Sequence, residues 1–161
     1  MNSDLAMIID ITEREYHGMS FNAPPLRKML DKLTLDEVTS TDTYEGYSVW
    51  GIVLHLLYWK YQLAEWLDVP DMPDYPYQKD NWPALPEVLS QEAWEKTLGL
   101  MDAYHDAYIS ALRTLPAGKL EEKMEAFGCP WADGIAWMTT HDTYHIAHIR
   151  NMGLKPFPEG E

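Results

Sequence analysis

Prolines and glycines divide this 161-residue chain into a few long segments, and that division limits its fold more than any other feature. Pro24-Pro25 interrupt the first part of the chain, and five prolines lie within residues 69–89. Pro116 and Pro130 bound a third, shorter break. A fold of many short strands would need turn residues at short, regular intervals, and this sequence does not have that pattern. The punctuation therefore predicts an all-α fold.

Apolar residues recur at helical spacing inside the long segments, and hydroxyl residues precede several of them. Ser48 and Ser90 are predicted N-caps, and Thr34 has the capping-box spacing to Glu37. Pro130 is expected at the first position of the last helix. The expected helical ranges are residues 3–16, about 25–33, a short turn after Thr34, 49–68, 91–115 and 130–152.

These helices predict a four-helix bundle that forms a single domain over residues 1–161, with an extra N-terminal helical segment in residues 1–20. The helix after Ser48 is apolar nearly all round, so we expect it at the centre of the bundle. Residues 69–89 are too rich in proline for regular structure and too rich in aromatic rings for a flexible linker. We expect an ordered crossover that covers one end of the bundle.

The composition excludes several classes of partner. Lys and Arg total 12 against 26 Asp and Glu, and a formal charge of −14 repels a phosphate backbone, which argues against nucleic acid. The N-terminus has no basic region, and no apolar run approaches the ~18 residues of a membrane span. Cys129 is the single cysteine, which excludes an intrachain disulfide and favours the cytoplasm.

Two histidines four residues apart are the candidate functional feature. His141 and His145 leave the same face of the last helix, and His148 lies within roughly 60° of them on a helical wheel. His55 lies on the expected central helix and can meet them in the core, where bundles build metal sites. The residues alone leave two interpretations open: a metal site, or a hydrogen-bonded core histidine with two packed neighbours.

Other polar residues are weaker candidates. Asp142 is expected to cap a neighbouring polar group, with orientation of a ligand or a place on the helix surface as alternatives. His105 is expected on a solvated face because Asp102 and Asp106 flank it. His17 is expected in a loop without a metal role. Further aromatic side chains either line a small-molecule pocket or fill the core: Trp59, Trp66, Tyr75, Tyr77 and Trp82.

Two separated segments resemble signatures of the DinB-like (DinB/YfiT) superfamily. Residues 46–59 (GYSVWGIVLHLLYW) resemble its second-helix signature, and residues 141–147 (HDTYHIA) resemble its fourth-helix signature. The resemblance implies a four-helix bundle, a homodimer, and a divalent ion such as zinc or nickel bound by His55, His141 and His145. A Gly-Gln pair commonly follows the last ligand in that superfamily, whereas this chain has Ala147-His148.

The resemblance also implies a class of activity. Characterised members include enzymes that use a small cellular thiol, so we expect a thiol-dependent S-transferase acting on a small electrophile, with a metal-dependent hydrolase as the alternative. A non-catalytic module that binds a small molecule or a partner, with structural histidines, is the third possibility. His148 and Tyr144 are candidate catalytic residues, and Trp59 and Gln62 are candidate pocket residues.

Overall fold

The computed structural model describes residues 3–22, 24–43, 45–116 and 118–153. Its long helices are α1 (Ser3–Tyr16), α4 (Val49–Trp66), α5 (Gln91–Arg113) and α6 (Trp131–Asn151). The short elements are α2 (Leu26–Leu30), α3 (Leu35–Thr39), the 3-10 turn η1 (Lys119–Glu121), and strands β1 (Lys123–Met124) and β2 (Cys129–Pro130). The prediction of an all-α bundle is confirmed. Within the described ranges, the β structure is a hairpin of β1 and β2.

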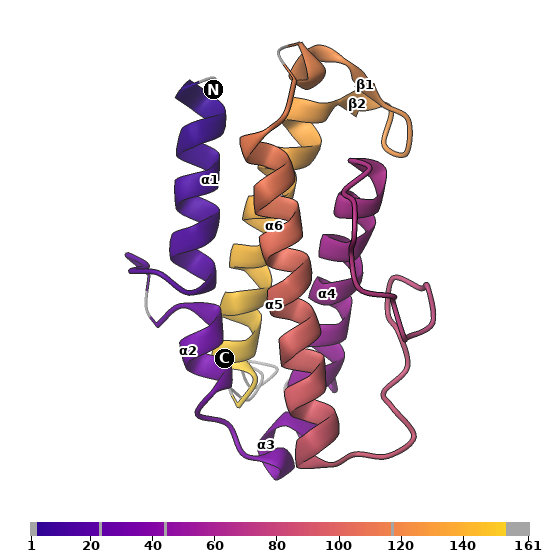
Figure 1. The fold of residues 1–161 in the computed structure, drawn as a ribbon. Helices are drawn as coiled ribbons and strands as arrows, with labels where there is room; N and C mark the ends of the chain where they lie inside the picture. The colour runs from indigo at the N-terminus through magenta and orange to yellow at the C-terminus, as the bar shows by residue number, and fades with distance from the viewer. Residues whose placement is uncertain (1–2, 23, 44, 117, 154–161) are drawn as a thin grey trace, which may run out of the picture.

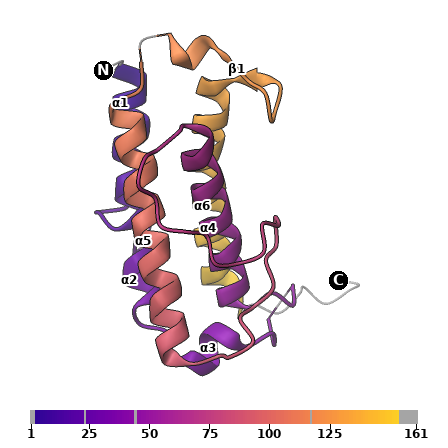
Figure 2. The same ribbon diagram turned by 45° about the vertical axis from the view of Figure 1, so that its right-hand side comes forward.

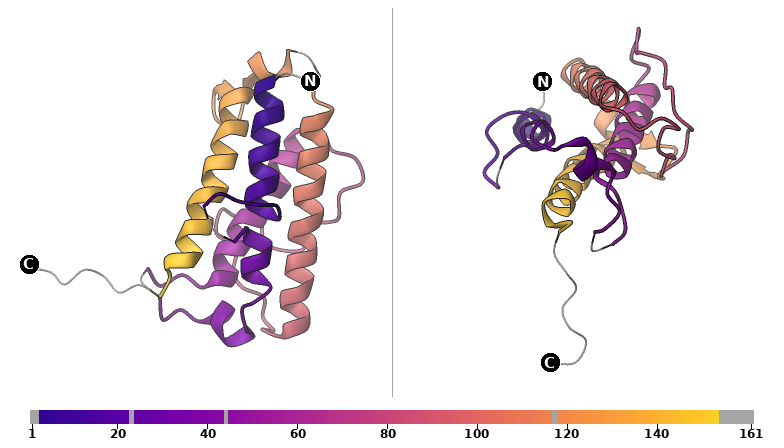
Figure 3. Two further views of the ribbon diagram at one scale, coloured as in Figure 1. Left: turned by 90° about the vertical axis from the view of Figure 1, so that its left-hand side faces the viewer. Right: turned by 90° about the horizontal axis from the view of Figure 1, so that it is seen from below.

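The four long helices lie side by side, and their directions set the connections (Figure 1). α1 and α6 run one way, and α4 and α5 run the other way (Figures 1 and 3). Two parallel neighbours cannot be joined by a short turn, so the chain from α4 to α5 must return along the bundle. Residues 69–89 make this return without helix or strand, as predicted.

The predicted position of that crossover was wrong. It runs down the side of the bundle instead of covering one end, because it joins the far end of α4 to the near end of α5 (Figure 2). The hydroxyl of Tyr104 on α5 donates to the carbonyls of Pro73 and Asp74 at 3.1 and 3.0 Å. The hydroxyl of Tyr77 lies 2.7 Å from that of Thr97. Side chains of α5 therefore hold the crossover against the helices.

The predicted helix starts are confirmed by their capping bonds. Ser48 accepts a hydrogen bond from the amide of Gly51, and Ser90 accepts one from the amide of Ala93. Thr34 forms a complete capping box with the third residue of α3. Pro130 is the residue before α6 and not its first helical residue, a shift of one position. The capping bonds of Ser48, Ser90 and Thr34 satisfy amide groups that have no partner within the helix.

The second predicted helix is shorter than expected, since α2 ends at Leu30 instead of residue 33. The amides of Lys32 and Leu33 bond three residues back, to Met29 and Leu30, which is the tighter geometry of a turn. Leu26 and Leu30 are fully buried all the same. The apolar spacing therefore identified the buried face but not the point where the helix ends.

α4 is the central helix, as predicted, and most of its side chains are buried. Its residues Trp50, Leu54 and Leu57 are fully buried in the core. Each such side chain contributes about 1.5–3 kcal/mol through burial. No helix within the described ranges is long and apolar enough to cross a membrane.

Candidate metal centre

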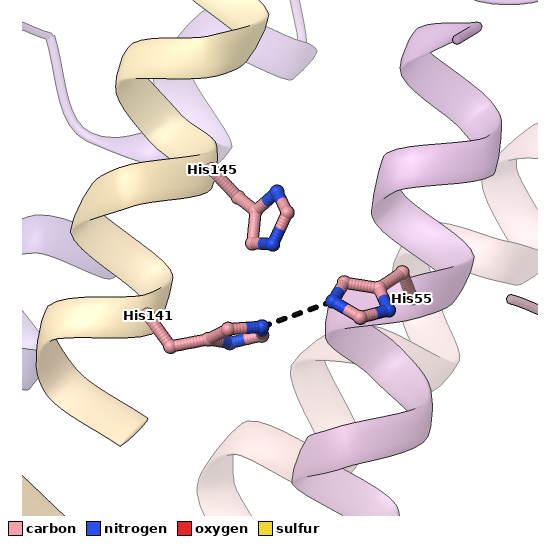
Figure 4. Close-up of side chains that lie close together, drawn as sticks. All are labelled: His55, His141 and His145. Carbon is pink, nitrogen blue, oxygen red and sulfur yellow. Dashed lines mark hydrogen bonds between the residues drawn. The ribbon is translucent and has the colours of Figure 1, made fainter. Parts of the chain in front are cut away.

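Three histidines from two helices meet on one side of the bundle. α4 supplies His55, and α6 supplies His141 and His145 (Figure 4). One ring nitrogen from each of the three lies within 4.8 Å of the other two. The Nε2 atoms of His55 and His141 are 2.9 Å apart. The cluster joins residues separated by 86 positions in the sequence, which the helical-wheel argument had predicted to meet.

Helical periodicity explains why α6 presents both of its histidines to α4. Residues four apart share a helical face, and Met138 and Met152 on the same side are buried. His145 is 5% exposed, whereas His141 is only partly buried because it lies nearer the edge of that face. Trp137, one turn before His141, is 36% exposed at the same edge.

The crossover fixes the protonated nitrogen of His55. Its Nδ1 lies 2.5 Å from the backbone carbonyl of Asn81, and a carbonyl oxygen can only accept a hydrogen bond. Nδ1 therefore carries the hydrogen, and the lone pair of Nε2 faces the other two histidines and accepts a hydrogen bond from Nε2 of His141. The indole N–H of Trp59 donates to the side-chain oxygen of Asn81 at 2.8 Å and so holds Asn81 in place. A carbonyl that orients a histidine in this way is typical of metal sites.

Trp82, the next residue of the crossover, covers the cluster. Its ring stacks on His55 with centroids 4.1 Å apart and planes 11° apart. Its other stacking partner is Tyr47, with centroids 4.7 Å apart. The ring of Trp82 also lies 6.1 Å from that of His145. The histidines are therefore shielded by an aromatic side chain that sequence reasoning had placed only in a pocket wall or the core.

Burial keeps the three imidazoles neutral. Loss of solvation lowers the pKa of His55, lowers that of His141 to about 3, and lowers that of His145 to about 4. The neighbouring imidazoles lower the last two values further, because adjacent positive charges repel. Neutral imidazole is the form that binds metals. The donor set therefore fits one divalent ion at neutral pH.

Asp142 is buried and is not an acid on the helix surface, so that alternative was wrong. Its carboxylate lies 2.5 Å from the Nζ of Lys60, and Lys60 is fully buried on α4. Burial raises the pKa of Asp142, and the ammonium of Lys60 acts in the opposite direction. The sequence contained a signal for this pair that we did not use: Lys60 is the basic residue of an otherwise mostly apolar helix.

The predicted solvated face around His105 was also wrong. His105 is fully buried and stacks on Tyr16 of α1 with centroids 3.7 Å apart. One flanking acid, Asp102, accepts a hydrogen bond from the Tyr16 hydroxyl at 2.6 Å. It also forms an ion pair with Arg27 at 2.9 Å. Asp102 therefore bonds to α1 and α2 although its side chain is 40% exposed, and the sequence of α5 alone could not reveal these contacts.

The remaining histidines lie outside the three-histidine cluster. The ring of His148 is 5.9 Å from that of His145, and its Nε2 lies 3.1 Å from a carboxylate oxygen of Glu45. His17 has a half-exposed side chain next to His105, 5.8 Å between ring centroids. His17 therefore lies beside α5, as expected of a histidine outside the metal site.

The other candidate residues lie around the cluster. Tyr144 is 61% exposed, and its ring meets the ring of His145 edge to face at 4.9 Å. Trp59 lines a cavity beside the histidines, together with Trp137. Gln62 donates to Glu65 at 2.8 Å. The catalytic roles of Tyr144 and His148 and the pocket role of Gln62 stay predictions.

Comparisons with known proteins agree with this arrangement of helices and histidines. A model of the DinB superfamily matches residues 24–149, a range that contains α4, the crossover, α5 and all three clustered histidines. α1 lies before the matched range. Neither a curated protein nor a solved structure matches the chain significantly. The family match covers most of the chain, and the chain therefore belongs to the DinB superfamily.

Proposed function

We propose that this protein is a divalent-metal-dependent enzyme acting on a small molecule, with His55, His141 and His145 as its metal ligands. The observation that carries the proposal is the convergence of three neutral imidazoles from α4 and α6 within 4.8 Å. Without an ion, one hydrogen bond joins the rings of His55 and His141 at 2.9 Å, and burial of further unpaired ring nitrogens is costly. Three protein ligands that leave room for a further ligand are the usual arrangement of a catalytic ion.

The chain prepares the site through residues that are not themselves ligands. A bound divalent ion would lower the pKa of a water or thiol into the physiological range. The carbonyl of Asn81 holds the His55 ring in the tautomer that leaves Nε2 unprotonated. Trp82 shields one side of that ring from water. Neutral ligands leave the full charge of the ion available to an anionic group such as a thiolate.

We propose thiol transfer as the reaction. The sulfur of a low-molecular-weight thiol forms a bond to an electrophilic carbon, the leaving group departs with its electron pair, and the thiol proton passes to a base. His148 is the candidate base, since its ring is 5.9 Å from His145 and Glu45 orients it at 3.1 Å. Tyr144, at the exposed edge of His145, is the candidate donor to the leaving group.

The first experiment tests metal binding. Protein purified without a His-tag is dialysed against zinc or nickel, and its metal content is measured together with that of His141→Ala and His17→Ala. We expect about one ion per chain in the wild type and in His17→Ala, and none in His141→Ala. Wild-type protein that stays metal-free would end the proposal.

The second experiment tests the reaction. Zinc- and nickel-loaded protein is screened with small thiols and chloronitrobenzene electrophiles, and with ester substrates that report hydrolysis. Thiol consumption that disappears in His141→Ala supports the transferase, whereas ester cleavage without thiol would replace it with a hydrolase. Loss of stability in His55→Ala with unchanged ligand affinity would instead favour a non-catalytic binding module.

A homodimer is also part of the proposal, on the family resemblance alone. Light scattering after size-exclusion chromatography distinguishes a mass near 18.6 kDa from twice that value. The cytoplasmic location stays a prediction from the single cysteine.

A further inference from the structure

A row of aromatic side chains begins one turn from the metal-site histidines on both α4 and α6. On α6, Asp133, Trp137 and His141 follow one another at intervals of four residues and so share one face. On α4, Trp59 lies one turn beyond His55. Four residues of helix advance about 6 Å, so the aromatic side chains begin one turn from the ligands. The ring of Trp137 is 4.8 Å from that of His141.

The hairpin between η1 and α6 adds a third ring to this row. Gly128 adopts a positive φ of 70° in the turn between β1 and β2, next to Phe127. The hairpin packs tightly on α6, because a Cβ at Gly134 would lie 2.6 Å from the sulfur of Met124. This close approach brings Phe127 within 5.3 Å of Trp137 and 5.7 Å of Trp59, measured between ring centroids.

These elements line a cavity of about 420 Å³ that is open to solvent on one side. Six residues line it: Trp59, Phe127, Cys129, Asp133, Gly134 and Trp137. The volume lies within the range of small-molecule sites, which are mostly apolar with a few polar groups. Phe127 and Trp137 are 43% and 36% exposed, and exposed aromatic rings gathered at one place mark a binding surface.

We propose that this cavity binds an uncharged aromatic group of the substrate and places the rest of that molecule beside the metal-site histidines. Its assignment to the substrate rests on the proposed function. A planar ligand can contact the edges and faces of the rings of Trp59, Phe127 and Trp137. Aromatic pairs prefer such edge-to-face and offset-stacked arrangements. The carboxylate of Asp133 and the net charge of −14 both disfavour an anionic group there.

The cavity itself is tested with a neutral probe, N-phenyl-1-naphthylamine, whose fluorescence rises in apolar sites. We expect one probe per chain, and at least tenfold weaker binding in Phe127→Ala and Trp137→Ala. Phe21→Ala is the matched control, since Phe21 is 92% exposed in another part of the chain, and it should bind as the wild type does. Wild-type affinity in both pocket variants, or no binding at all, would overturn the proposal. Far-UV circular dichroism confirms that each variant is folded.

The connection to the histidines is tested with two thiols of different size. Cobalt-loaded protein is titrated with 2-phenylethanethiol and ethanethiol, and the sulfur-to-cobalt charge-transfer band is followed. We expect at least tenfold tighter binding of the aromatic thiol, a preference that Phe127→Ala removes. Equal binding of the two thiols would overturn the substrate assignment while the metal site stands. Protein that takes up no cobalt would overturn the proposed function, and the naphthylamine titration would still decide whether the cavity binds aromatic groups.

Discussion

α4 and α6 meet through two buried polar groups that differ in how they are satisfied. The first is the ion pair of Lys60 and Asp142, which closes at 2.5 Å with opposite charges. The second is the cluster of His55, His141 and His145, in which like groups face one another. Asp142 directly follows His141 on α6, and Lys60 lies five residues after His55 on α4. The same two helices therefore carry a pair of opposite charges and a cluster of like groups.

The ion pair stabilises the fold by itself, whereas we propose that the histidine cluster binds a metal ion. Lys60 and Asp142 neutralise each other, and the ring of Tyr16 lies 5.4 Å from the ammonium. In the cluster, the Nε2 atoms of His55 and His141 share one hydrogen bond at 2.9 Å, whereas the Nδ1 atoms of His141 and His145 are buried without one. A buried polar group is costly unless it is paired, so an ion bound by the ring nitrogens that face one another would stabilise the cluster.

The largest expected effect comes from breaking the ion pair. Asp142→Asn keeps the shape of the side chain but leaves the buried ammonium of Lys60 without its counter-charge. We expect a loss of about 3–5 kcal/mol in the free energy of unfolding, measured with urea on metal-free protein. The double variant Lys60→Met/Asp142→Asn should recover most of that loss. A single variant as stable as the wild type would remove the contrast between the two groups.

Metal removal tests the other side of the comparison. An ion at 100 times its dissociation constant stabilises the folded chain by about 2.7 kcal/mol. We expect this gain in thermal unfolding of the wild type and of Asp142→Asn, its loss on adding a chelator, and no gain in His141→Ala. An equal gain in His141→Ala would show that the ion binds elsewhere.

A pH titration separates His105 from the ligands. Burial lowers the pKa of His105 far below its ordinary value of 6.5. The unfolded chain therefore binds a proton below about pH 6.5 that the folded chain does not bind, so stability is complete above that pH and falls as the pH falls. We expect His105 to contribute up to about 1.4 kcal/mol per pH unit, or about 2 kcal/mol between pH 6.5 and 5.

Urea unfolding of the wild type and His105→Gln over this range provides the measurement. The three clustered histidines add a slope of the same sign, so the difference between the two proteins isolates His105. A variant with the wild-type slope would contradict the buried, neutral state of His105. Its metal content should match the wild type, because His105 lies outside the cluster.

The smallest effect is expected at the residue that supports Asn81. Trp59→Phe removes the indole N–H that bonds to Asn81 at 2.8 Å, at a cost of about 1 kcal/mol. His55 then loses part of its orientation, and metal affinity should fall about tenfold in a calorimetric titration. Trp66→Phe is the matched control on the same helix. Equal affinities in the two variants would mean that Asn81 does not need Trp59.

Features that depend on a single helix could be predicted from the sequence. Caps such as Ser48 and Ser90, and the shared face of His141 and His145, follow from local chemistry and helical period. Features that depend on how helices are rotated against each other were missed. The burial of His105 required the position of α1, and the pairing of Asp142 required the position of α4.

The path of the crossover was equally beyond the sequence pattern. Its prolines exclude regular structure but do not say which carbonyl lies against which histidine. The contacts of Asn81 and Trp82 with His55 arise because the segment returns along the bundle between parallel helices. The meeting of the three histidines could therefore be predicted, whereas the residues that orient and shield His55 could not.

A crystal structure of nickel- or zinc-loaded protein with an anomalous difference map tests the central claim most directly. The account predicts one anomalous peak per chain, about 2.0–2.1 Å from a ring nitrogen of each of His55, His141 and His145. A fully loaded protein with its peak elsewhere, for example between His17 and His105 or among surface carboxylates, would contradict it.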